Sequence, residues 1–139
     1  MISRKNDRKH AFCVIFQRSF GIRAEALEDL EYYLENFAEE KMSEPDFVLN
    51  EIQGVFDNLA NIDKHIEETS SAWDITRISK VDLAIMRLAV YEILYMDKIV
   101  PAVSINEAVE LAKTYSTEDS RKFVNGVLGK IVKGLEVAE

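Results

Sequence analysis

The sequence predicts an all-α protein, and three observations support that prediction. Apolar residues recur at the helical spacing of three and four through most of the chain, and no segment alternates convincingly as a β-strand would. Only five glycines and two prolines interrupt the 139 residues, which favours long helices. This length suits one domain with a sizeable core, so we expect a single compact helical domain over residues 1–139.

The first two of six expected helices span residues 4–20 and 24–39. Apolar side chains follow helical spacing in both segments, and the second segment carries its acids on the opposite face. Gly21 lies just past the first segment, where glycine commonly ends a helix.

The third helix is expected to run unbroken from Ser43, as its cap, to Ile66. Pro45 suits the first turn, and the apolar stripe continues over about five turns. A polar stretch then separates it from a fourth helix over residues 80–95, which is apolar on nearly every side. This fourth helix should therefore be the most buried one.

Hydroxyl side chains mark the starts of the last two helices. Ser104 and Glu107 have the spacing of a capping box for the fifth helix, and Ser116 or Thr117 would cap the sixth. Trp73, near a helix end, fits a core position and an interface position equally well.

Charge is distributed unevenly along the chain. The net charge is −8, but residues 24–68 hold fourteen acidic side chains against two lysines, so the remainder carries +4. A local basic region can bind a polyanion even in an acidic protein. One cysteine excludes an internal disulfide, and the apolar run at 11–16 is too short for a membrane or signal segment. These features predict a cytoplasmic protein without a membrane segment.

The first helix begins with a basic ridge. Arg4, Lys5, Arg8 and Lys9 share the helical face that continues into Phe12. Cations oppose the helix dipole at an N-terminus, so this arrangement favours a compensating polyanion such as RNA or DNA. A frayed, solvated helix start explains the segment equally well.

The start of the last helix combines cations with an aromatic residue. Phe123 lies on the flank of the apolar stripe near Lys130, whereas Lys122, Gly126 and Gly129 face away from the stripe. Each glycine costs a helix about 1 kcal/mol relative to alanine. An aromatic residue beside cations suits base stacking and phosphate binding. Alternatively, Phe123 packs on a neighbouring helix and the glycines admit its close approach.

The chain contains no motif of a known catalytic or metal site. Glu92 lies on an apolar helix face and needs a partner, such as Arg77 or another basic side chain. His10 and His65 lack a second ligand at metal spacing, and Cys13 lacks a partner for redox or nucleophilic chemistry. Phosphate-loop and nucleophile motifs are absent too. We therefore expect no catalytic residues, no metal and no cofactor.

Three segments stand out: "WDITRISKVDLAIMRLAVYEILY" (73–95), "VPAVSINEAVELAKTYSTEDSRKFVNGVLGKI" (100–131) and the basic opening ahead of "FCVIFQ" (12–17). Together these segments resemble the NusB family of bacterial transcription antitermination factors. The resemblance implies an all-α fold of two three-helix bundles. It also implies pairing with the small-subunit ribosomal protein that serves as NusE. That pair binds single-stranded boxA RNA in nascent ribosomal RNA transcripts and joins the RNA polymerase antitermination complex, which supports read-through of terminators.

The resemblance and the residue patterns predict the same RNA-binding surface. The resemblance implies that Asp82 contacts the ribosomal-protein partner, whereas the residue pattern alone fits a solvated acidic face. Lysine at position 5 and an acid at Asp7 depart from the family's arginine-rich pattern. The residues expected to bind RNA are Arg4, Lys5, Arg8, Lys9, Asp119, Lys122 and Phe123.

The predicted surface requires that the first and last helices pack side by side. Some family members self-associate through this surface, so a homodimer is an open alternative to the monomer. A protein-interaction module that never binds RNA is the alternative function.

Overall fold

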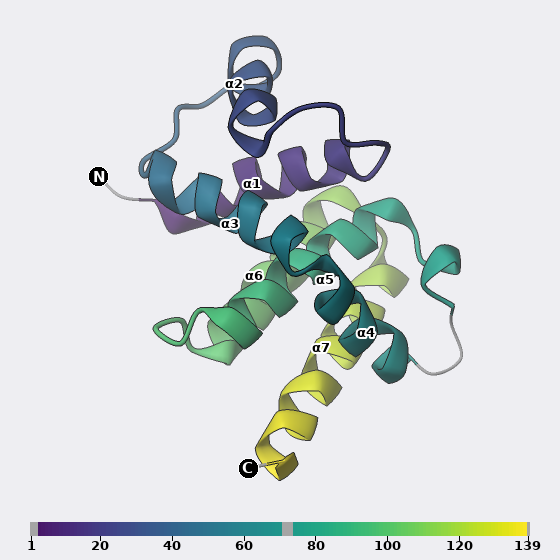
Figure 1. Ribbon diagram of the computed structural model, residues 1–139. Helices are drawn as coiled ribbons and strands as arrows, with labels where there is room; N and C mark the ends of the chain where they lie inside the picture. The colour runs from purple at the N-terminus through teal and green to yellow at the C-terminus, as the bar shows by residue number, and fades with distance from the viewer. Residues whose placement is uncertain (1–2, 71–73, 139) are drawn as a thin grey trace.

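The structure, a computed structural model, describes residues 3–70 and 74–138, so Trp73 lies outside it (Figure 1). Every regular element in these ranges is helical, which confirms the all-α prediction. None of these helices is long and apolar enough to span a membrane. The elements are α1 (Arg4–Arg18), α2 (Ala26–Asn36), α3 (Pro45–Asp57), α4 (Leu59–Ser70), the 3-10 helix η1 (Ile75–Arg77), α5 (Lys80–Tyr95), α6 (Pro101–Tyr115) and α7 (Glu118–Ala138).

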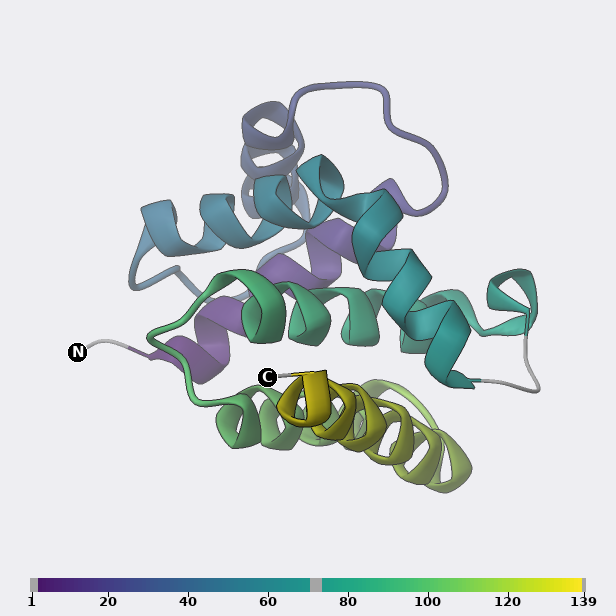
Figure 2. The same ribbon diagram turned by 60° about the horizontal axis from the view of Figure 1, so that its bottom comes forward.

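Helix α5 is the centre of the molecule. It packs against α1 and α3 of the N-terminal half and against α4, α6 and α7 (Figures 1 and 2). Between Asp82 and Glu92 only Arg87 is not fully buried, which confirms the expectation that this helix is the most buried. The helices α1–α3 and α5–α7 thus form the two three-helix halves, and α4 connects them.

The expected single helix from Ser43 to Ile66 is wrong, because the chain breaks at Asn58 into α3 and α4. The Asn58 side-chain amide donates to the carbonyl of Gly54 at 2.8 Å, and this local bond competes with continuation of the helix. Apolar spacing continues across the break, so periodicity alone could not reveal it.

Two of the predicted helix caps, Ser43 and Ser104, are wrong, because each serine forms a hydrogen bond with a residue of another helix. Helix α3 is capped by Glu44, and the backbone N–H groups of Ser43 and Glu44 donate to the Asp7 carboxylate at 2.8 and 3.0 Å. Ser104 lies inside α6, where its hydroxyl donates to Glu92 at 2.7 Å. In both places a side chain links helices that are far apart in sequence.

Other expected helix ends are confirmed. Thr117 caps α7, since its hydroxyl accepts from the backbone N–H of Ser120 at 3.1 Å. Gly21 follows α1 with a φ of 138°, a conformation that other residues rarely adopt.

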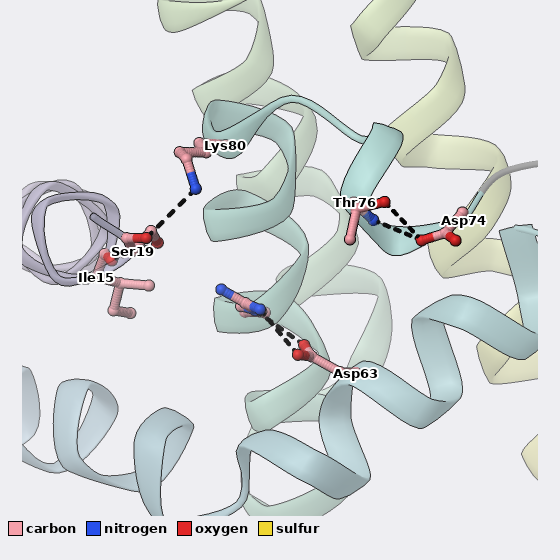
Figure 3. A network of polar contacts seen from close by, with 7 residues as sticks. Ile15, Ser19, Asp63, Asp74, Thr76 and Lys80 are labelled. Atoms are coloured by element: carbon pink, nitrogen blue, oxygen red, sulfur yellow. Dashed lines mark hydrogen bonds and ion pairs between the residues drawn. The ribbon is translucent and has the colours of Figure 1, made fainter. Parts of the chain in front are cut away.

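Polar contacts fix α5 against its neighbours at two points. Asp63 of α4 extends towards α5 (Figure 3), where both of its oxygens accept from Arg87 at 2.8 Å. Such a bidentate pair fixes the relative orientation of two helices. At the start of α5, Lys80 donates to the carbonyl of Ser19 at 3.4 Å, which ties α5 to the end of α1 (Figure 3).

Alanine substitution of a glycine in α3 and of one in α7 should have opposite effects on stability. A Cβ at Gly54 would overlap the Tyr91 ring, whereas a Cβ at Gly126 meets nothing within 4 Å. We expect Gly54→Ala to lower the free energy of unfolding by about 1–3 kcal/mol through overpacking. Gly126→Ala should raise it by up to about 1 kcal/mol through helix propensity. Urea unfolding checks both, and equal effects at the two sites would contradict the described packing.

Candidate nucleic-acid interface

The basic ridge at the start of α1 divides in the folded protein. Arg4 and Lys5 are exposed and Lys9 is half-buried, but Arg8 retains only 6% of its accessible surface. The four cations therefore do not face solvent as a unit. Three of them remain accessible to a polyanion, and the fourth belongs to the interior.

Arg8 is the buried partner that Glu92 requires. Its Nε donates to Glu92 Oε2 at 2.9 Å, and the Ser104 hydroxyl donates to Oε1 at 2.7 Å. Glu92 is 1% exposed, so both carboxylate oxygens are satisfied inside the protein. The sequence left Arg77 or another basic side chain open as this partner, and the structure supplies the second, since Arg77 lies on η1 and is exposed. Arg8 thus ties the basic opening of α1 to α5 and α6.

A second buried acid, Glu51 of α3, lies beside this pair. It is fully buried, and neither carboxyl oxygen has a hydrogen-bond partner in the described residues. Burial, and then the neighbouring Glu92 carboxylate, raise the pKa of Glu51 well above its ordinary value. The fold thus favours the neutral form of Glu51, and the nearby Arg8 opposes that shift only partly.

Arg4 is exposed but held in place. Its guanidinium carbon lies 3.7 Å from the centroid of the Phe47 ring, and it pairs with Glu44 at 3.3 Å. Both contacts are with the start of α3, which lies beside the start of α1. Lys5 extends instead towards α6 and lines a groove there. The accessible cations of α1 therefore project from an anchored helix end.

Three grooves follow one another between α1 and the start of α7. Their volumes are about 290, 430 and 290 Å³ in that order. The first groove is lined by Ser3, Lys5, Asn6, Lys9, Glu107, Glu110, Leu111, Thr114 and Tyr115. The second groove is lined by Lys9, His10, Phe12, Cys13, Phe16, Gln17, Tyr33, Phe37, Glu39, Glu40, Val81 and Tyr115. The third groove is lined by Arg77, Ile78, Ser79, Asp82, Asp119, Ser120 and Phe123.

Lys9 and Tyr115 line both the first and the second groove, so these two grooves adjoin. The second and third grooves share no lining residue, but Val81 of the second immediately precedes Asp82 of the third on α5. The expected side-by-side packing of the first and last helices is wrong, because α1 packs against α2, α3 and α5 whereas α7 packs against α4, α5 and α6. The end of α6 lies between them, where the Tyr115 ring is 5.1 Å from Phe12. The three grooves, here called the strip, thus run from the basic opening of α1 to the start of α7.

Phe123 combines the two positions that the sequence left open. It is half-buried, packs against the core and also lines the third groove beside Asp119. Lys122 is exposed on the other flank of α7. The interpretation that Gly126 and Gly129 admit a close neighbouring helix is wrong, since a Cβ at either position meets no atom within 4 Å. That face of α7 is open to solvent.

Asp82 lies in the wall of the third groove, although only 6% of its surface is accessible. One of its oxygens accepts from the Ser116 hydroxyl at 2.8 Å, and its backbone N–H donates to Ser79 at 3.1 Å. Asp82 thereby fixes the turn between α6 and α7 to the start of α5. Its predicted contact with a protein partner stays a prediction.

Sequence reasoning missed the roles of Asp7 and Glu51. Asp7 departs from the basic pattern because it is fully buried and accepts the N–H groups that precede α3. An acid within a run of cations was the available signal. Glu51 gave no such signal, because its burial depends on which face of α3 meets α5. Among residues 3–70 and 74–138, no group of three or more histidine, cysteine or acidic side chains could hold a metal ion.

The fold and this strip define a class of protein: an all-α binding protein whose basic helix start borders a row of grooves. The chain belongs to the NusB family, whose model matches residues 5–133.

Relatives and a solved structure agree with that assignment. The chain is 56% identical over 88 residues to the transcription antitermination protein NusB of Acetivibrio thermocellus, which covers 63% of this chain and 61% of that protein. It is 41% identical to NusB of Clostridium novyi over 95% of this chain and 99% of that protein. A solved structure of the antitermination factors NusB and NusE in complex with double-stranded RNA contains a similar chain, with a TM-score of 0.83 and 26% identity. That match covers 94% of this chain and 96% of that one.

Removal of Arg8 should unfold the protein more easily than removal of its exposed neighbour. Arg8→Ala leaves Glu92 buried without its cation, so we expect the free energy of unfolding to fall by about 3–5 kcal/mol. Lys5→Ala should change it by less than about 0.5 kcal/mol. Replacing Arg8 and Glu92 together by leucine should recover much of the loss, because no charge is then left unpaired. Urea unfolding measures all three, and an Arg8→Ala variant as stable as Lys5→Ala would contradict the buried pair.

The stability of the Glu51→Gln variant, relative to that of the wild type, should increase as the pH rises. In the unfolded chain Glu51 ionises near pH 4.3, whereas its pKa in the folded protein is raised. The wild type therefore loses stability as the pH rises from the unfolded pKa to the folded pKa, and the glutamine variant lacks that loss. We expect the variant to gain stability relative to the wild type between pH 4 and pH 8. A difference that does not change with pH would show that Glu51 titrates alike in both states.

Proposed function

We propose that this protein is a transcription antitermination factor that binds single-stranded boxA RNA in nascent ribosomal RNA transcripts. It does so together with a NusE-type small-subunit ribosomal protein, and the pair helps RNA polymerase to read through terminators. The protein acts by binding and not by catalysis, in the bacterial cytoplasm where transcripts are made. Membership of the NusB family supports this proposal, as does the likeness to a NusB solved with NusE and RNA.

The RNA-binding part of the proposal rests on one observation: cations border the first and the third of the three grooves, at the two ends of the strip. Lys5 and Lys9 border the first groove, and Arg77 lines the third. Lysine and arginine neutralise phosphates, and the release of counterions then supplies most of the affinity. The acidic segment 24–68 repels RNA from most of its own surface. Its Glu39 and Glu40 also line the second groove, so the phosphate contacts are expected at the two ends of the strip.

Each predicted residue has a distinct role in this proposal. Arg4, Lys5 and Lys9 bind phosphates, while Arg8 acts as a positioning residue that anchors α1 through Glu92. The exposed part of the Phe123 ring stacks on a base, which requires a single strand with splayed bases.

Acidic residues complete the proposed surface. Asp119 is exposed, so its carboxylate can accept a hydrogen bond from a base amino group. Asp82 contributes to the surface for the ribosomal protein, because it lies in the groove wall beside Asp119. A homodimer through the same strip would compete with RNA, so RNA should dissociate such a dimer.

The direct test is a titration of fluorescent boxA-like RNA with the protein, at two salt concentrations, with and without the NusE-type ribosomal protein. Neutralising about four phosphates of a single strand predicts a log–log salt slope near −3. We expect tighter binding with the partner present, and weaker binding of the same sequence as a duplex. A folded protein that binds no RNA under any of these conditions would favour the protein-interaction module.

Two substitutions should separate phosphate contacts from stacking. Lys5→Ala should weaken RNA binding and reduce the salt slope by about 0.7, which is the share of one phosphate on a single strand. Phe123→Leu keeps apolar packing at this half-buried position but removes the aromatic face, so RNA affinity should fall by roughly 1–3 kcal/mol. The matched control is Lys64→Ala, an exposed lysine within the acidic segment. A slope that falls equally in Lys5→Ala and Lys64→Ala would remove Lys5 from the interface.

A further inference from the structure

A fourth groove lies between α6 and α7, on the flank of α7 that faces away from Phe123. Its volume is about 450 Å³, which is within the range of small-ligand sites. Helix α6 supplies three apolar side chains and one amide, and α7 supplies two cations and one amide. The lining residues are Ala102, Ile105, Asn106, Val109, Arg121, Lys122 and Asn125.

Charge distinguishes this groove from the three grooves of the strip. Each of those three is lined by at least two acidic residues, and the α6/α7 groove is lined by none. The surrounding segment of α7, residues 120–135, holds four cations and no acid in a chain of net charge −8. Arg121 pairs with Glu118 at the rim, while Lys122 is exposed. The groove is therefore complementary to an anion.

The two amides add hydrogen-bonding capacity to that charge. Asn106 and Asn125 are both exposed, one on each wall of the groove. A carboxamide carries donors and an acceptor together, so it can pair with the edge of a nucleic-acid base. The apolar side chains of α6 give a base a surface to lie against. Cations, amides and an apolar floor together match a nucleotide better than they match a simple anion.

We infer that the α6/α7 groove holds one nucleotide of the bound RNA strand, with its phosphate on Lys122 and its base edge on Asn106 and Asn125. The inference rests on the proposed RNA binding and extends it to a second face of α7. Because Lys122 and Phe123 are consecutive, the start of α7 separates this groove from the third groove of the strip. A strand that crosses the start of α7 contacts both grooves.

The test combines alanine variants with RNAs that each lack one base. The protein, paired with the NusE-type ribosomal protein, is titrated with boxA-like single strands that carry an abasic site at each position in turn. Asn106→Ala and Asn125→Ala should each weaken binding of the intact RNA about tenfold, as expected for loss of one base contact. One abasic position should weaken binding to the wild type and have little further effect on either variant. Gln53→Ala, which removes an exposed amide from α3, is the matched control.

The outcomes separate this inference from the proposed function. If the wild type binds RNA and Lys5→Ala weakens it, but both asparagine variants behave like Gln53→Ala, the nucleotide site is wrong and the proposed function stands. If both asparagine variants lose affinity for the ribosomal protein and keep their RNA affinity, the groove is a protein surface and the inference is overturned. If the folded wild type binds no RNA, both fail together.

Discussion

The buried pair of Arg8 and Glu92 is the interaction on which the rest of the structure depends. Removing two charges from water costs several kcal/mol each, and the fold recovers that cost only because the carboxylate also accepts from Ser104. The pair links α1 to α5 and α6, so it sets the direction in which the basic opening leaves the core. Glu51 is buried beside the pair, and burial raises its pKa well above its ordinary value, so the fold favours its neutral form. The exposed lysines are therefore presented by a fixed helix end.

Charge then separates the two faces of the molecule. The acids concentrate in residues 24–68, which form α2, α3 and most of α4, whereas the cations gather on α1 and α7. The turn between α6 and α7, held by Ser116 and Asp82, connects these two basic ends. In the proposed function, an RNA strand contacts these two ends, because the acidic helices repel it elsewhere. Net charge alone would have hidden this arrangement.

Sequence patterns predicted local features of the fold, but they could not predict contacts between residues far apart in the chain. The burial of α5, the glycine after α1 and the Thr117 cap all follow from spacing within one turn or two. The break at Asn58 was missed because apolar periodicity continues through it, and the bond from the Asn58 side chain to the Gly54 carbonyl leaves no periodic signal. Ser43 and Ser104 looked like caps, yet their groups bond Asp7 and Glu92 on other helices. The basic ridge was recognised as a set, but which of its cations turns inward depends on the position of α5. The separation of α1 from α7 likewise depends on tertiary packing.

An NMR titration of the labelled protein with boxA-like RNA, in the presence of the NusE-type ribosomal protein, would locate the RNA on the surface most directly. We expect chemical-shift changes at the backbone amides of Lys5 and Lys9, around the turn from Tyr115 to Phe123, and at Asn106 and Asn125. The amides of α3 after Phe47 should stay unchanged, because α3 lines none of the three grooves. Shift changes centred on α3, or none at all with a folded protein, would contradict an RNA path along the strip.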